Sequence, residues 1–207
     1  MQFHSEDTEK FLELSKWRRD VRRFKRDAVC KESIAILKRA IAYAPSVGNS
    51  RPWRFVNVND AYRRQSIITN FEKANQEAAE IYSDEKKAHY NRLKLAGLKE
   101  APIHLAVFTD INPSEGAGLG RQTMPETLAY STVMAIHQLW LAARSLNLGV
   151  GWVSILDTDS INALLDVPQE WLFTAYLCVG YPQFSSDEPE LQTQGWQENI
   201  ESDWLQR

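Results

Sequence analysis

The stretch TMPETLAYSTVMAIHQLWLAARSLNLGVGWVSI, residues 123–155, combines one strongly apolar helix with one buried strand. Residues 123–126 form a capping-box pattern with Pro in the first turn, which predicts a helix that starts there and runs to about Asn147. Apolar residues fall on nearly every side of this helix, which is typical of a central core helix or of a helix at a subunit interface. Gly149 ends the helix, and residues 150–155 follow as a predicted strand.

Helices and strands alternate along the rest of the chain. Apolar spacing predicts helices over residues 8–17, 31–43 and 61–99, the last one broken near Ser83–Asp84, and a short helix capped by Asp157. Alternating or continuous apolar runs predict strands over residues 53–58, 103–109, 150–155 and 173–179. Residues 83–99 are rich in Lys and Arg, which predicts a solvated surface element or a lid.

The length and the C-terminal arm bear on domain organisation. Residues 1–207 show no seam and are predicted to form a single domain. The arm, about residues 181–207, has low regularity but contains Trp196 and Trp204. Because two tryptophans are costly to leave in water, we expect this arm to pack across another subunit.

The composition is that of a soluble globular chain, with 43% hydrophobic and 25% charged residues. Lys and Arg number 24 and Asp and Glu number 27, so the formal charge is −3, which argues against a sequence-independent nucleic-acid binder. The sequence contains neither the ~18-residue apolar run of a membrane span nor the apolar segment of a signal peptide. We therefore expect a cytoplasmic protein in which Cys30 and Cys178 stay reduced.

Two common kinds of site are not expected. The four histidines have no paired spacing, which argues against a catalytic metal. The glycines of residues 116–120 follow a strand and precede a helix, but Arg121 stands where a dinucleotide fingerprint needs its third glycine. These residues are more typical of a flexible surface loop.

The strongest local signal is the segment Arg18-Arg19-Asp20-Val21-Arg22. If this segment is helical, Arg18 and Arg22 share a face about 6 Å apart along the axis, at ~1.5 Å rise per residue. Three neighbouring guanidiniums repel one another unless they share an anion, and phosphate suits the planar fork of arginine. The alternative is a solvated charge run with an internal Arg–Asp pair, and the spacing alone favours that alternative.

Two further segments are candidates for ligand contacts. Residues 44–53, APSVGNSRPW, offer a serine hydroxyl and a glycine that allows close backbone approach, although a plain helix-to-strand loop would need the same residues. Residues 149–154, GVGWVS, place two glycines at the start of a strand, where something flat could press against the backbone. Ser154 in an apolar strand needs a partner, either a ligand or a neighbouring carbonyl.

In this order, the three segments resemble the nitroreductase-like flavoprotein family. Within that family the sequence is similar to the flavin destructases, which make 5,6-dimethylbenzimidazole, over roughly residues 15–197. The matching segments are RRDVR, APSVG with Pro52-Trp53, ANQEAAE (74–80), residues 130–144, GVGWVSI and the EPEL…GW tail.

The resemblance implies an α+β fold with a central mixed or antiparallel sheet flanked by helices, in a homodimer with exchanged arms. It also implies O2-dependent fragmentation of reduced FMN to 5,6-dimethylbenzimidazole and erythrose 4-phosphate, without a metal. The reduced FMN would come from a flavin reductase. The alternatives are an NAD(P)H-dependent nitroreductase and a flavin-storing or heme-binding relative without turnover.

Carried over by motif, Arg18, Arg19 and Arg22 would hold the FMN phosphate. Ser46 would lie near the ribityl chain and ring, while Asp20 and Ser154 would take part in the chemistry. The complete set implied to contact FMN is Arg18, Arg19, Asp20, Val21, Arg22, Ser46, Gly48, Val150, Gly151 and Ser154. The tail around Gln194–Gln197 carries no charge where relatives often have basic residues, so no tail residue is assigned to the phosphate.

Overall fold

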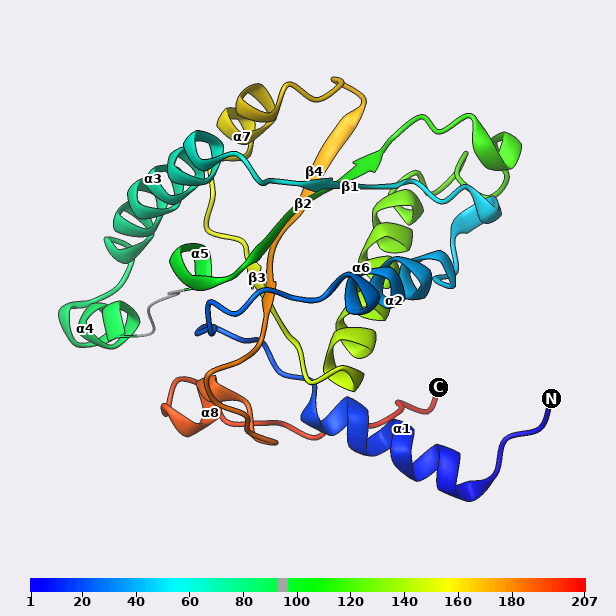
Figure 1. The fold of residues 1–207 in the computed structure, drawn as a ribbon, viewed down its shortest axis with the longest axis horizontal. Helices are drawn as coiled ribbons and strands as arrows, with labels where there is room; N and C mark the ends of the chain where they lie inside the picture. Colours follow the sequence, from blue (N-terminus) through cyan, green and yellow to red (C-terminus); the bar gives the residue numbers. More distant parts are fainter. Residues whose placement is uncertain (93–96) are drawn as a thin grey trace.

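The computed structural model describes residues 1–92 and 97–207, which fold around one four-stranded sheet (Figure 1). The strands are β1 (Trp53–Asn57), β2 (Ile103–Asp110), β3 (Gly149–Val153) and β4 (Trp171–Gly180). They lie in the order β1-β2-β4-β3, and every neighbouring pair is antiparallel. The predicted α+β fold with a central sheet is therefore confirmed.

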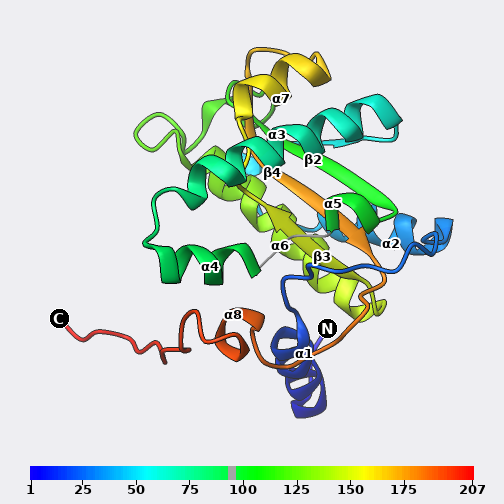
Figure 2. The same ribbon diagram turned by 90° about the vertical axis from the view of Figure 1, so that its left-hand side faces the viewer.

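The two inner strands, β2 and β4, are apolar on both faces and divide the core into two clusters. Phe108 and Tyr176 point into the cluster beneath α3 (Ala61–Ala79) and α7 (Thr158–Leu165). Val107 and Leu177 point into the opposite cluster, beneath α2 (Lys31–Ala42) and α6 (Thr127–Ser145). Figures 1 and 2 show these helix pairs on opposite sides of the sheet. Because successive side chains of a strand alternate between the two faces of the sheet, a continuous apolar run indicates a strand that is buried on both faces.

Helix α6 is the predicted apolar helix, but it begins later than the capping box suggests. Residues 124–126 form a turn instead, in which the amide and the hydroxyl of Thr127 both donate to the Met124 carbonyl. The N-cap is Glu126, without a side-chain capping bond, so the predicted start at Thr123 is wrong. Leu139 and other α6 residues fill the core, whereas Tyr130, Val133 and Met134 on the outer side remain exposed.

The remaining helices follow the predicted pattern with shifted ends. Helix α1 (Ser5–Trp17) buries none of its residues. The long stretch breaks as predicted after α3, giving α4 (Asp84–Arg92) and α5 (Gly97–Glu100), while residues 93–96 of the predicted lid lie outside the described part. Asp157 caps α7 by accepting a hydrogen bond from the Ser160 amide. Short helical turns occur at η1 (Val47–Asn49), η2 (Glu115–Gly118) and α8 (Glu190–Thr193).

The C-terminal arm packs partly on its own chain. Trp196 lies against an aromatic group around α4, with ring centroids 5.6 Å from Tyr82 and 5.4 Å from His89. This tryptophan therefore contacts its own chain, and the expected packing of the arm across another subunit stays a prediction. Trp204 behaves differently: it is 89% exposed on a stretch that extends away from the fold (Figure 2).

Candidate functional site

The arginine segment is extended, not helical. Helix α1 ends at Trp17, and Arg18 already has extended backbone angles (φ −74°, ψ 114°). The segment runs parallel to β3: Asp20 forms a bridge with Val150, and the Val21 amide donates to the Val150 carbonyl at 3.0 Å. The shared helical face considered for Arg18 and Arg22 is thus wrong. The physical reason is that β3 is an edge strand, whose unpaired backbone groups bind this segment.

The glycines of β3 make room for this segment. A Cβ built on Gly151 would lie 2.2 Å from the Val21 carbonyl oxygen, and one built on Gly149 would lie 2.5 Å from Val21 Cγ2. The chain's own Val21 therefore occupies the space that these two glycines leave. Val150 is completely buried in the core. A contact of Val150 or Gly151 with a flavin ring stays a prediction, while their role in holding residues 20–22 is visible.

A cavity of about 310 Å³ lies beside the segment, between α1, α6 and the C-terminal arm. The Arg18 guanidinium lies over the ring of Trp140, 5.0 Å from its centroid, and the Trp140 indole N–H donates to the Arg19 carbonyl. Side chains from three arginines of the segment line the cavity together with residues of the arm. The main lining residues are Arg18, Arg19, Asp20, Arg22, Trp140, Arg144, Phe184, Glu190 and Gln194.

Arg19 is short of partners within this cavity. Its Nη atoms donate to the carbonyls of Arg18 and Asp187, but its buried Nε meets no acceptor among the described residues. Burial lowers the pKa of Arg19, and the neighbouring positive charge of Arg18 lowers it further. An anion such as a phosphate would relieve both the unpaired donor and the repulsion, so these residues fit the phosphate group of FMN.

Asp20 sits at the inner edge of the cavity. Its Oδ1 accepts a hydrogen bond from the Trp152 amide at 2.9 Å, and its Oδ2 lies 3.7 Å from Arg22 Nε. Burial raises the pKa of Asp20 above its ordinary value, an effect that the Trp152 amide and Arg22 offset in part. The internal Arg–Asp pair of the alternative interpretation therefore exists. It occurs within a cationic cavity, and Asp20 is a carboxyl with an increased tendency to hold a proton.

The loop that carries Ser46 and Gly48 is strained and firmly held. Gly48, Asn49 and Arg51 all have left-handed backbone angles, with φ of 55°, 55° and 46°. The Ser46 hydroxyl accepts a hydrogen bond from the Arg51 amide, and the Ser131 hydroxyl accepts one from the Val47 amide. Such strain persists only where surrounding contacts enforce it, and it is frequent at functional sites.

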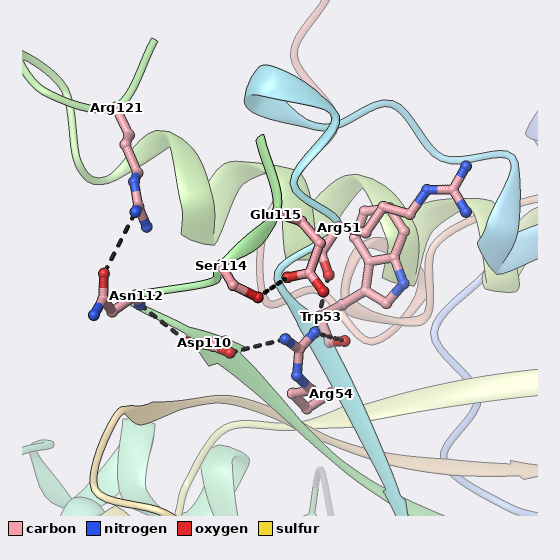
Figure 3. A network of polar contacts seen from close by, with 8 residues as sticks. All are labelled: Arg51, Trp53, Arg54, Asp110, Asn112, Ser114, Glu115 and Arg121. Atoms are coloured by element: carbon pink, nitrogen blue, oxygen red, sulfur yellow. Dashed lines mark hydrogen bonds and ion pairs between the residues drawn. The ribbon is translucent and has the colours of Figure 1, made fainter. Parts of the chain in front are cut away.

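Arg54 fastens the end of this loop to the sheet (Figure 3). Its guanidinium donates to the carbonyls of Arg51 and Trp53 and pairs with the Asp110 carboxylate at 2.8 Å. The Asp110 carboxylate also accepts a hydrogen bond from the Asn112 amide, which ties in the start of the following loop. The backbone of residues 51–53 is therefore fixed relative to β1 and β2.

The glycines of residues 116–120 support the same loop. A Cβ on Gly116 would lie 2.6 Å from the Gly48 carbonyl oxygen, and one on Gly48 would lie 2.7 Å from the Leu119 carbonyl oxygen. The two loops therefore pack backbone to backbone. The glycines of residues 116–120 allow this close packing, which is a role that the sequence alone does not reveal.

The residues implied to contact FMN fall into two groups. Residues 18–22 lie beside Val150 and Gly151 of β3 and next to Trp140 of α6. Ser46 and Gly48 lie at η1, where the Val47 amide donates to the hydroxyl of Ser131 near the start of α6. Ser154 directly follows β3 and is exposed, so its hydroxyl does not require a hydrogen-bond partner from the protein. Sequence reasoning missed Trp140 and Glu190, although both lie in segments that carry the family resemblance.

Residues 1–92 and 97–207 contain no group of three or more His, Cys, Asp and Glu side chains placed to hold a metal ion. No helix in this described part is long and apolar enough to cross a membrane.

Comparison with known proteins agrees with this geometry. A sequence model of the nitroreductase family matches residues 15–181. The 5,6-dimethylbenzimidazole synthase of Rhodospirillum rubrum is 54% identical over 89% of this chain and 87% of its own length. A 5,6-dimethylbenzimidazole synthase of Rhodobacter capsulatus is 45% identical over the full length of both chains.

Solved structures agree on the fold. The chain superposes on an iodotyrosine deiodinase bound to FMN and 3-iodo-L-tyrosine with a TM-score of 0.73, at 24% identity and over 95% and 97% of the two chains. At that identity, the likeness concerns the fold alone. The sequence relatives are far more similar and cover nearly the whole chain. The chain therefore belongs to the nitroreductase family and, within it, to the 5,6-dimethylbenzimidazole synthases.

Proposed function

We propose that this protein is a 5,6-dimethylbenzimidazole synthase that uses O2 to fragment reduced FMN, with erythrose 4-phosphate as the second product. The observation that carries the proposal is the position of Asp20. It is a carboxyl with a raised pKa, held between the Trp152 amide and Arg22 at the edge of an arginine-lined cavity. The identity to curated synthases supplies the reaction class.

The arginines would bind the phosphate, and Asp20 would move protons. Arg18, Arg19 and Arg22 offer planar donors for phosphate oxygens, and Arg19 Nε has a donor to spare. Reduced FMN is the substrate, and it brings the electrons that O2 accepts. Breaking carbon–carbon and carbon–nitrogen bonds requires protons to be removed and returned, and a carboxyl with a raised pKa suits that task near neutral pH. Ser154 would orient the reacting ring by donating a hydrogen bond.

The working form would be a homodimer with an FMN site at each subunit interface. Within one chain, the arginine segment contacts Trp140 of α6, whereas the Ser46 loop contacts Ser131, about two and a half turns earlier on the same helix. A homodimer could bring the two segments to one FMN from different chains. The surface supports such an assembly: α1 buries nothing, and Phe11, Tyr130, Val133 and Met134 are exposed. Exposed apolar groups of this kind mark protein interfaces.

The test is product formation by the purified protein. Reduced FMN supplied chemically or by a separate flavin reductase, followed by air, should yield 5,6-dimethylbenzimidazole detectable by mass spectrometry. A nitroreductase would instead oxidise NAD(P)H and return FMN intact. A storage protein would return FMN intact without oxidising NAD(P)H. Intact FMN as the only flavin product would contradict the proposal.

A further inference from the structure

The Arg22 guanidinium lies between two carboxylates from distant parts of the chain. Its Nε is 3.7 Å from Asp20 Oδ2 and 3.6 Å from Glu190 Oε2. Asp20 belongs to the segment along β3, whereas Glu190 is the first residue of α8 in the C-terminal arm. The Arg22 side chain is 14% exposed, whereas the side chains of Asp20 and Glu190 are 38% and 46% exposed, so solvent screens both ion pairs in part.

The arm is anchored on both sides of Glu190. Before it, the Asp187 carboxylate pairs with Lys16 Nζ at 2.8 Å, and the Asp187 carbonyl accepts a hydrogen bond from Arg19. After it, the Trp196 ring packs on the aromatic side chains around α4. The position of Glu190 beside Arg22 is thus built into the packing of the arm.

The surroundings of Asp20 raise its pKa overall. Burial raises the pKa of Asp20, and the negative charge of Glu190 adds to that effect, while the Trp152 amide and Arg22 act in the opposite direction. The groups that face Asp20 are Arg18 and Arg22 of its own segment, the Trp152 amide of β3, Cys178 of β4 and Glu190 of α8.

We propose that Glu190 is a positioning residue for the reaction: it shares the Arg22 guanidinium with Asp20, which leaves Asp20 an ion pair weak enough to accept and return a proton. This inference rests on the proposed function. A full ion pair stabilises the charged form of a carboxyl and makes it a poor proton acceptor. An uncharged side chain at position 190 would remove the carboxylate that competes with Asp20 for the Arg22 guanidinium.

The test compares Glu190→Gln with Glu198→Gln, a matched change on an exposed residue of the same arm that does not line the cavity. In the FMN-free protein, the titration of the Asp20 carboxyl is followed by ¹³C NMR. We expect Glu190→Gln to lower the midpoint of the Asp20 titration by about half a pH unit or more. The substitution removes the negative charge of Glu190, and Arg22 is then no longer shared with this second carboxylate. Glu198→Gln should leave the midpoint in place.

The FMN-loaded protein supplies the second measurement. In Glu190→Gln, the acid limb of the single-turnover rate should move to lower pH by the same amount, while FMN binds as tightly as before or more tightly. An unmoved Asp20 midpoint would overturn the inference. A changed FMN affinity with an unmoved pH profile would also overturn it, because Glu190 would then only compete with phosphate for Arg22.

The two proposals fail in distinguishable ways. If the wild-type protein makes no 5,6-dimethylbenzimidazole, the proposed function is wrong. The titration of the FMN-free protein needs no turnover, so it decides separately whether Glu190 acts on Asp20.

Discussion

The carbonyl oxygen of Val21 lies directly over Gly151, so closely that a Cβ on the glycine would stand 2.2 Å from it. This contact joins the segment that holds the arginines to the edge strand of the sheet. The adjacent Val21 amide bonds to the Val150 carbonyl, and the Trp152 amide bonds to Asp20, so one strand edge positions both the arginines and the carboxylate.

Gly151→Ala should push the arginine segment away from β3. The added methyl meets a backbone oxygen that cannot rotate away, so we expect a loss of about 1–3 kcal/mol in the free energy of unfolding. FMN affinity should fall at least about tenfold because the phosphate donors lose their common support. Denaturant unfolding and calorimetric FMN titration measure the two effects, and unchanged values for both would show that the segment is not held by this contact.

Much of the fold was predictable from side-chain pattern alone. The break between α3 and α4, the four strands and the apolar character of α6 follow from apolar spacing and from Gly and Pro, which are local signals. The start of α6 was misplaced because residues 124–126 form a turn of backbone bonds, which competes locally with the capping-box geometry that the same letters favour.

The candidate site was less accessible to sequence reasoning because its contacts are not local. Nothing near Arg18 indicates that β3, more than a hundred residues later, offers an unpaired edge to it. The same holds for Glu190 beside Arg22 and for Trp196 on α4, which join parts of the chain that only the fold brings together. The family resemblance implies that the arginines bind phosphate, but it does not reveal the strand or the arm that positions them.

Arg22→Ala should weaken binding of FMN much more than binding of riboflavin. A charge-assisted contact to phosphate contributes about 1.5–3 kcal/mol, which corresponds to roughly 10- to 150-fold in affinity, and riboflavin lacks the phosphate. Arg26→Ala, on an exposed neighbour, is the matched control and should change neither affinity. If Arg22→Ala lost the same affinity for FMN as for riboflavin, the three arginines of the segment would have a structural role and would not bind the phosphate.

The exposed outer side of α6 should be a dimer contact. Met134→Glu places a charge among Tyr130 and Val133, so we expect it to convert the dimer to a monomer near 24 kDa, the mass of one chain. Tyr62→Glu, a similar change on an exposed residue of α3, should leave the dimer intact. Light scattering reads the mass directly, and a wild-type monomer at micromolar concentration would refute the expected assembly.

His104 should make the fold less stable in acid. Its ring is buried against the Tyr176 hydroxyl, at 3.0 Å, and burial lowers the pKa of His104 to about 4. The unfolded chain takes up this proton near pH 6.5, so stability falls as the pH decreases from about 6.5 towards 4.

The contribution is on the order of 2 kcal/mol, and the comparison with His104→Gln isolates it from the other titrating groups. Urea unfolding at pH 7 and pH 5 should show a larger loss of stability for the wild type than for the variant. Equal losses would mean that His104 titrates alike in the folded and unfolded chains.

Asp20→Asn should bind FMN at least as well as the wild type yet form little or no 5,6-dimethylbenzimidazole. Asparagine keeps an oxygen for the Trp152 amide, and the lost negative charge favours a phosphate among the arginines. An amide cannot accept and return protons near neutral pH, so turnover should fall by about 10²-fold or more. Asp27→Asn, the same change on an exposed aspartate a few residues later, should retain turnover. Mixing the reduced-FMN complex with air in a stopped-flow instrument separates binding from chemistry. If Asp20→Asn gave the wild-type yield, Asp20 would serve only to balance the charge of the arginines. The observation that favours the destructase reaction over nitroreduction would then be lost.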